Sequence, residues 1–125
     1  MLTIREGAFV DGFHEPCGTN CGAESAAAIA LAFDETVEKL DGEVLYAVYL
    51  QADWEGNAYV LLLINGKLHE IEAGHCSCNG LEGSWNPAPT NFGALQNRRF
   101  YGAEASKDTV LEAAWAAIGN GSKRP

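Results

Sequence analysis

The chain is poor in cations and contains no long apolar run. Eight lysines and arginines stand against 17 aspartates and glutamates, which gives 125 residues a formal net charge of −9. Nucleic acid is bound largely by neutralising its phosphates, so a chain with so few cations is not expected to bind it directly. Apolar runs such as 26–33 and 59–64 are far shorter than the roughly 20 residues of a membrane-spanning helix, so no membrane segment is expected.

The N-terminus also lacks a basic region followed by an apolar core, so no signal peptide is expected. The length suits one domain, residues 1–125, with a modest core. These features are typical of a cytoplasmic protein. In a reducing cytosol the four cysteines are expected to be free or metal-bound rather than linked in disulfides.

The first regular element predicted by the sequence is a helix over residues 22–40. Thr19 or Asn20 can cap its start and Gly42 can end it. Residues 1–21, which include "EPCGTNCG", are rich in turn formers and predict no regular structure. An apolar stripe recurs at helical spacing and comprises Ile29, Phe33, Val37 and Leu40.

Three strands are predicted after this helix, over 43–51, 57–64 and 67–72. Asn65–Gly66 between the last two is a strong signal for a two-residue hairpin turn. Two weaker helical patterns follow. One begins at Thr90 or Asn91, and the other covers residues 106–118. The fold class is therefore α+β: a three-stranded antiparallel meander, with the N-terminal and C-terminal helices packed on one face.

Acidic side chains are concentrated in the first three quarters of the chain. Residues 6–97 contain 14 acidic residues but only two basic ones, Lys39 and Lys67. An acidic surface of this kind can bind a basic surface on another protein, although it also simply keeps a small protein soluble. The candidate partner-binding residues are Asp34, Glu35, Glu38, Asp41, Glu43, Asp53 and Glu55.

Cysteine and histidine form two clusters, "HEPCGTNC" at 14–21 and "HCSC" at 75–78. Zinc takes four sulfur or imidazole ligands, often two from each of two loops, so a zinc ion is a possible cofactor. Both pairs depart from the common C-x2-C spacing, and the alternative is that the thiols simply pack as small apolar groups. The candidate ligands are Cys17, Cys21, Cys76 and Cys78, with His14 or His75 able to replace one of them.

A thiol-dependent enzyme is a further alternative for these clusters. Cys21 would lie near the start of the first predicted helix, where the helix dipole lowers a thiol pKa. The sequence contains no phosphate-binding loop and no nucleophile elbow, and it identifies no third group to orient a thiol. Glu70 and Glu72 share one side of a predicted strand, where solvation is the simpler role. No catalytic residue is assigned, and the chain is expected not to be an enzyme.

The stretch from about Val44 to Pro87 contains a distinctive set of residues. They are Gly66, Lys67, Leu68, Glu70, His75, Cys76, Ser77, Cys78, Gly80, Leu81, Glu82, Trp85 and Pro87. In these residues the stretch resembles a group of small, mostly uncharacterised proteins encoded by tailed phages and prophages. The resemblance implies a phage or prophage origin and carries no established activity. By analogy, a small acidic phage protein acts on a host protein with a basic surface, as anti-CRISPR inhibitors of host defence do, in the host cytoplasm.

Two further expectations concern packing. Residues 74–87 are predicted to form an ordered loop over the sheet edge, with Leu81 and Trp85 returning to the core. A homo-oligomer is a third functional alternative, because exposed aromatic side chains can mark a self-interface. The aromatic residues considered for it are Trp54, Tyr59 and Phe100.

Overall fold

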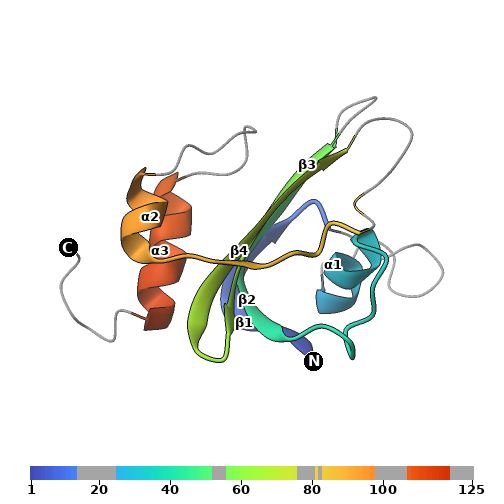
Figure 1. The fold of residues 1–125 in the computed structure, drawn as a ribbon, viewed down its shortest axis with the longest axis horizontal. Helices are drawn as coiled ribbons and strands as arrows, with labels where there is room; N and C mark the ends of the chain where they lie inside the picture. Colours follow the sequence, from blue (N-terminus) through green and yellow to red (C-terminus); the bar gives the residue numbers. More distant parts are fainter. Residues whose placement is uncertain (14–24, 52–55, 76–80, 82, 98–106, 119–125) are drawn as a thin grey trace.

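The structure is a computed structural model that describes residues 1–13, 25–51, 56–75, 81, 83–97 and 107–118. Within these residues, five strands form one sheet and three helices lie against its faces (Figure 1). The strands, in their spatial order, are β1 (Leu2–Asp11), β2 (Gly42–Gln51), β3 (Gly56–Ile64), β4 (Lys67–His75) and β5 (Ala88–Pro89). The helices are α1 (Ala26–Ala32), α2 (Phe92–Asn97) and α3 (Lys107–Ile118).

The sheet is mixed. β1 runs parallel to β2, whereas β2, β3, β4 and β5 pair antiparallel in succession. Parallel neighbours cannot be joined by a tight turn, so the chain between β1 and β2 crosses one face of the sheet, and α1 lies in this crossover.

The predicted α+β class and the antiparallel trio β2–β3–β4 are confirmed, but the predicted number of strands is wrong. Asn65 and Gly66 form the β3–β4 turn with φ values of 53° and 76°, as the hairpin signal indicated. The strand β1 was missed because turn formers dominate residues 12–21, although Leu2 and Ile4 alternate with the polar residues Thr3 and Arg5. The two-residue β5 is too short to leave a sequence signal.

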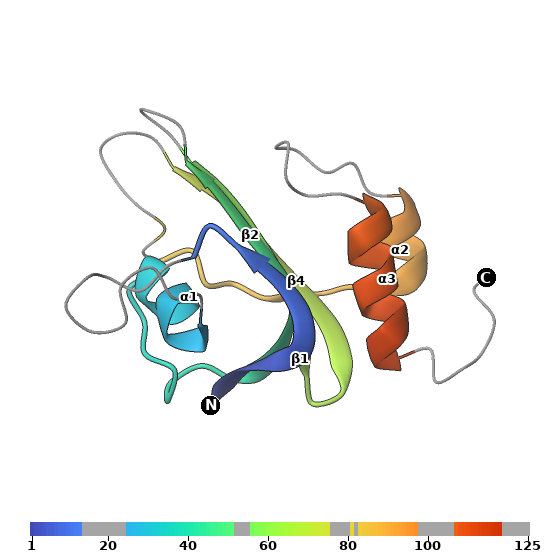
Figure 2. The same ribbon diagram turned by 180° about the vertical axis from the view of Figure 1, so that it is seen from behind.

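The prediction that all helices cover one face is also wrong. Figures 1 and 2 show α1 on one face and α2 with α3 on the other. Central strands covered on both faces are apolar on both sides, which explains the nearly continuous runs "VLYAV" and "YVLLLI". In β2 and β3, the α1 side buries Val44, Ala47, Val60 and Leu62, and the α3 side buries Leu45, Tyr46, Tyr59 and Leu61.

The first helix is much shorter than the predicted 22–40. The Ser25 hydroxyl caps its start by accepting the Ala28 N–H at 3.1 Å, whereas residues 19–24 lie outside the described part of the chain. It stops because Asp34 takes a left-handed conformation, φ 59°. The Asp34 N–H donates to Leu31 and the Glu35 N–H donates to Ala30, which is the Schellman pattern that closes a helix.

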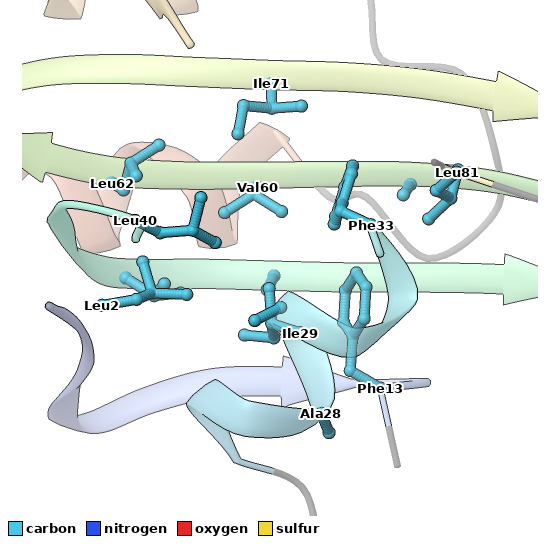
Figure 3. Close-up of a cluster of buried hydrophobic side chains, with 14 residues drawn as sticks. Leu2, Phe13, Ala28, Ile29, Phe33, Leu40, Val60, Leu62, Ile71 and Leu81 are labelled. Carbon is cyan, nitrogen blue, oxygen red and sulfur yellow. The ribbon is translucent and has the colours of Figure 1, made fainter. Parts of the chain in front are cut away.

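The predicted apolar stripe nevertheless enters one core. Ile29 and Phe33 are fully buried, Leu40 is buried and Val37 is half-buried, although the last two follow the helix instead of belonging to it. Figure 3 shows this α1-side core, the cluster of buried residues that joins α1 to the sheet. The cluster consists of Leu2, Phe13, Ala28, Ile29, Ala30, Phe33, Leu40, Val44, Ala47, Ala58, Val60, Leu62, Ile71 and Leu81. The spacing therefore identified core residues correctly while assigning too many of them to a helix.

The predicted return of Leu81 and Trp85 to the core is confirmed, but Gly74 and His75 of the predicted loop 74–87 belong to β4, and residues 76–80 and 82 lie outside the described part of the chain. Leu81 is fully buried in the α1-side core, and the Trp85 ring meets Phe33 edge-on with ring centroids 5.1 Å apart. Tyr59, considered as an exposed interface residue, is instead buried at 3% exposure. Trp54 and Phe100 lie outside the described residues.

The C-terminal helices agree with their prediction. The Asn91 side chain caps α2 by accepting the Ala94 N–H at 2.8 Å. Val110 and Ala114 of α3 are fully buried against the sheet. The α3-side core consists of these two residues and of Leu45, Tyr46, Val48, Tyr59, Leu61, Leu68, Phe92 and Leu95. In the described part of the chain, no helix has the length and apolar character needed to cross a membrane.

Candidate acidic surface and cysteine segments

Four of the seven predicted partner-binding carboxylates lie in one short connection. This acidic connection, residues 34–41, joins α1 to β2 and carries Asp34, Glu35, Glu38 and Asp41. Glu35 is half-buried and the other three carboxylates are exposed. Lys39 lies among them, so the connection carries four negative charges and one positive charge.

The backbone of the acidic connection is fixed at several points. The Schellman hydrogen bonds hold its start, with the Glu35 N–H 2.8 Å from the Ala30 oxygen. In its middle, the Val37 carbonyl accepts the Leu2 N–H at 2.9 Å. Near its end, Leu40 is anchored in the α1-side core. The carboxylates therefore project from an ordered segment, which reduces the entropy lost when they meet a partner.

Few cations balance these carboxylates. Asp41 lies 3.1 Å from the Met1 amine, but the Asp41 side chain is 84% exposed and the contact is therefore weak. Asp34, Glu35 and Glu38 have no ion-pair partner among the residues that the structure describes. Their negative potential is therefore available to a partner.

Glu43 does not belong to this group. Its carboxylate is paired with the Arg5 guanidinium at 3.2 Å, and both side chains are about two-fifths exposed. Val44, the next residue of β2, faces α1, so alternation directs Glu43 toward the α3 side of the sheet. This neutralisation was not predictable from the sequence pattern, because no strand was predicted for the segment that contains Arg5.

Asp53 and Glu55 lie outside the described residues, between β2 and β3. The described ends of that connection are Gln51 and Gly56, which pair with each other. Gln51 is eight residues along β2 from Glu43, or roughly 26 Å at the rise of an extended strand. Among the five predicted carboxylates that the structure describes, four lie in the acidic connection, and Glu43 lies on β2 with its side chain paired to Arg5.

All four predicted metal ligands, Cys17, Cys21, Cys76 and Cys78, lie outside the described residues, as does His14. The residues that flank the two cysteine segments nevertheless converge. Phe13, which precedes the first segment, stacks with Phe33 at a ring-centroid distance of 6.3 Å. Trp85, which follows the second segment, contacts the same Phe33 ring edge-on at 5.1 Å. Figure 3 places Phe13, Phe33 and Leu81 together in the α1-side core.

Two further polar side chains, on β3 and β4, have hydrogen-bond partners. The Tyr59 hydroxyl donates to Glu70 at 3.0 Å, so Glu70 is not simply solvated as its strand position suggested. His69 Nδ1 lies 3.0 Å from the Lys67 carbonyl oxygen. Within the described ranges, no three histidine, cysteine, aspartate or glutamate side chains are grouped so as to hold a metal ion.

Compared with protein-family models, curated proteins and solved structures, the chain has no match. The resemblance of residues 44–87 to phage and prophage proteins therefore stays a prediction. The function is therefore inferred from the surfaces of the chain itself. Among the predicted sites, the acidic connection combines an ordered backbone with exposed carboxylates.

Proposed function

We propose that the chain is a non-enzymatic binding protein whose acidic connection docks on a basic surface of another protein. The observation that carries this proposal is the ordered backbone of residues 34–41, which presents carboxylates that few cations neutralise. Complementary charge accelerates association and selects between partners, even where it adds little affinity.

The expected partner is a host protein. The phage-like character of the loop that contains "HCSCNGLEGSWNP" supports this choice, and a cytoplasmic host factor fits the predicted compartment. The form of the function that we expect is inhibition of a host defence complex, with carboxylates occupying a basic groove that otherwise holds nucleic acid phosphates.

Charge reversal tests the proposal. A variant with Glu38→Lys and Asp41→Lys changes the net charge by four while leaving the Schellman turn intact. We expect it to lose the proteins that the wild-type chain retains from a bacterial lysate, as measured by quantitative mass spectrometry. Because both side chains are exposed, its melting temperature should stay close to that of the wild type.

The matched control is Asp11→Lys with Asp108→Lys, which changes the charge equally at two exposed positions outside the acidic connection. The control should retain the same proteins as the wild type. Equal loss in both variants would show that only net charge matters, and unchanged retention in both would remove the acidic connection as the binding site.

A second function, a structural zinc site built by Cys17, Cys21, Cys76 and Cys78, is favoured by one observation. Phe13 and Trp85, which flank the two cysteine segments, contact the same Phe33 ring. Zinc bound by both segments would then stabilise the fold by closing two loops against one core.

Native mass spectrometry of the reduced protein tests this second function. The mass of one zinc ion per chain, lost on chelation together with several degrees of melting temperature, is the expected result. The Cys→Ser variants at positions 17 and 76 should abolish the added mass. A bare mass with four free thiols would leave the cysteines as packing residues.

A further inference from the structure

A hollow of about 250 Å³ opens between the edge strand β1 and helix α3. Figure 2 shows β1 at the edge of the sheet, with α1 to one side and α3 to the other. The hollow lies on the α3 side, away from the crossover that carries the acidic connection. Its volume is below the roughly 300–1,000 Å³ of sites for drug-sized molecules, but it leaves room for one large apolar side chain.

The hollow exists because small residues meet where two elements face each other. On β1, Gly7 stands between Arg5 and Phe9, and a Cβ built at Gly7 would have no atom within 4 Å. On α3, the facing wall includes Ala113 and Ala116, which recur at helical spacing. Neither wall supplies enough apolar volume to fill the space.

The floor and one wall of the hollow are aromatic and apolar. Leu45 and Tyr46 line it from β2, where an irregularity in register between Val44 and Tyr46 turns both side chains to the α3 side. The Phe9 ring stacks on Tyr46 with centroids 5.5 Å apart, yet Phe9 is 47% exposed. An apolar side chain entering the hollow would cover this ring and gain its contact.

The rim of the hollow is acidic. Glu6 on β1 and Glu112 on α3 are exposed, and neither has an ion-pair partner in the described part of the chain. The nearby cation, Arg5, is already paired with Glu43 at 3.2 Å. A ligand that fits this rim therefore carries lysine or arginine beside its apolar anchor.

The backbone beside the hollow also departs from regular pairing. Ile4 pairs with Val44 and Phe9 with Tyr46, so residues 5–8 have no register partner in β2. Backbone N–H and C=O groups outside a regular ladder can bond to an extended segment laid across them. The same irregularity disfavours edge-to-edge pairing of two copies, which would also bring together two chains of charge −9.

We propose that this hollow binds an extended segment of a partner protein, with one apolar side chain inserted beside Phe9 and a neighbouring lysine or arginine at Glu6 and Glu112. The site is separate from the acidic connection. Because the two sites share no residue, peptide binding at the hollow can be tested separately from partner binding at the acidic connection.

A random peptide library displayed against the full chain provides the test. Before selection, peptides that bind the Ala116→Trp variant are removed from the library. In this variant a bulky side chain at an exposed position on α3 fills the hollow. We expect enrichment of peptides with an aromatic or aliphatic residue and a lysine or arginine within two positions of it. A selected peptide should shift backbone amide NMR signals of residues 5–9 and 109–116.

Three variants sharpen the result. Ala116→Trp should weaken the selected peptide at least about tenfold, as for loss of an anchor pocket, while Ala27→Trp on the exposed surface of α1 should not. Glu6→Gln with Glu112→Gln should weaken it about threefold and reduce its salt dependence.

Several outcomes would overturn the proposal. These are no enrichment over Ala116→Trp, a consensus without basic residues, and NMR shifts confined to the acidic connection. Light scattering that shows a dimer dissociated by Ala116→Trp would assign the hollow to a second copy of the chain, which also overturns it.

Discussion

The two faces of β1 differ in how completely they are covered. On the α1 side, Leu2, Ile4 and Val10 pack into the core beneath the crossover. On the α3 side, Gly7 and Phe9 border a hollow, and Phe9 keeps nearly half its surface exposed. An edge strand can therefore be committed to the core through one face while its other face stays open for binding. The difference arises from small residues on β1 and α3, since both faces have a helix opposite them.

The largest expected effect is in the α1-side core, which covers the closed face of β1. Phe33→Ala should lower the free energy of unfolding by about 4 kcal/mol, because a fully buried ring would be replaced by a cavity. Chemical denaturation measures this change. Loss of the ring would also separate Phe13 from Trp85, so a small effect would show that the α1-side core is less tightly packed than its contacts indicate.

The end of β1 should be nearly as sensitive. Gly12 has φ +87°, and a Cβ there would overlap the Tyr49 carbonyl oxygen and lie 2.9 Å from the Tyr49 carbonyl carbon. Gly12→Ala should therefore destabilise the fold by about 3 kcal/mol, because backbone must move to relieve the overlap. Thermal unfolding checks this value, and a melting temperature near wild type would contradict the close approach of β1 and β2.

The open face should tolerate the same truncation far better. Phe9→Ala should cost only about 1 kcal/mol, because the ring is 47% exposed and mainly loses its stacking on Tyr46. Chemical denaturation of Phe9→Ala and Phe33→Ala under the same conditions compares the free energy lost by identical truncations on the two sides of the sheet. Equal losses would remove the distinction between a closed face and an open one.

The smallest expected effect is a stabilisation. Asp34 closes α1 in a left-handed conformation that glycine adopts without steric cost. Asp34→Gly should raise the free energy of unfolding by about 0.5 kcal/mol, after allowing for the greater freedom of glycine in the unfolded chain. Asp34→Val is the contrasting variant and should destabilise. If both variants lowered stability alike, the proposed helix ending would be wrong.

The parts of the fold that sequence predicted best depend on neighbours in sequence. The Asn65–Gly66 turn sets the β3–β4 hairpin locally, and the spacing of Val110 and Ala114 marks α3. The pairing of β1 with β2 joins distant segments, and no local residue type announces it. The end of α1 was missed for a related reason, since an aspartate in a left-handed conformation is less recognisable than a glycine.

The candidate site was predictable only in part. Charge counting located the acidic connection, because charge density is a property of the sequence alone. It could not separate Glu43, whose neutralisation by Arg5 depends on the parallel register of β1. The hollow was not predicted either, since it depends on which small residues of β1 and α3 come to face each other.

The parallel pairing of β1 also has a consequence for the order of folding. β2, β3 and β4 are successive antiparallel neighbours, so their contacts can form by closing short loops. β1 reaches β2 only after residues 12–41 have been closed into a loop, which costs more chain entropy. We therefore expect the β2–β3–β4 unit to assemble early and β1 to dock late. In native-state hydrogen exchange, the amides of β1 should then open at lower free energy than those of β3.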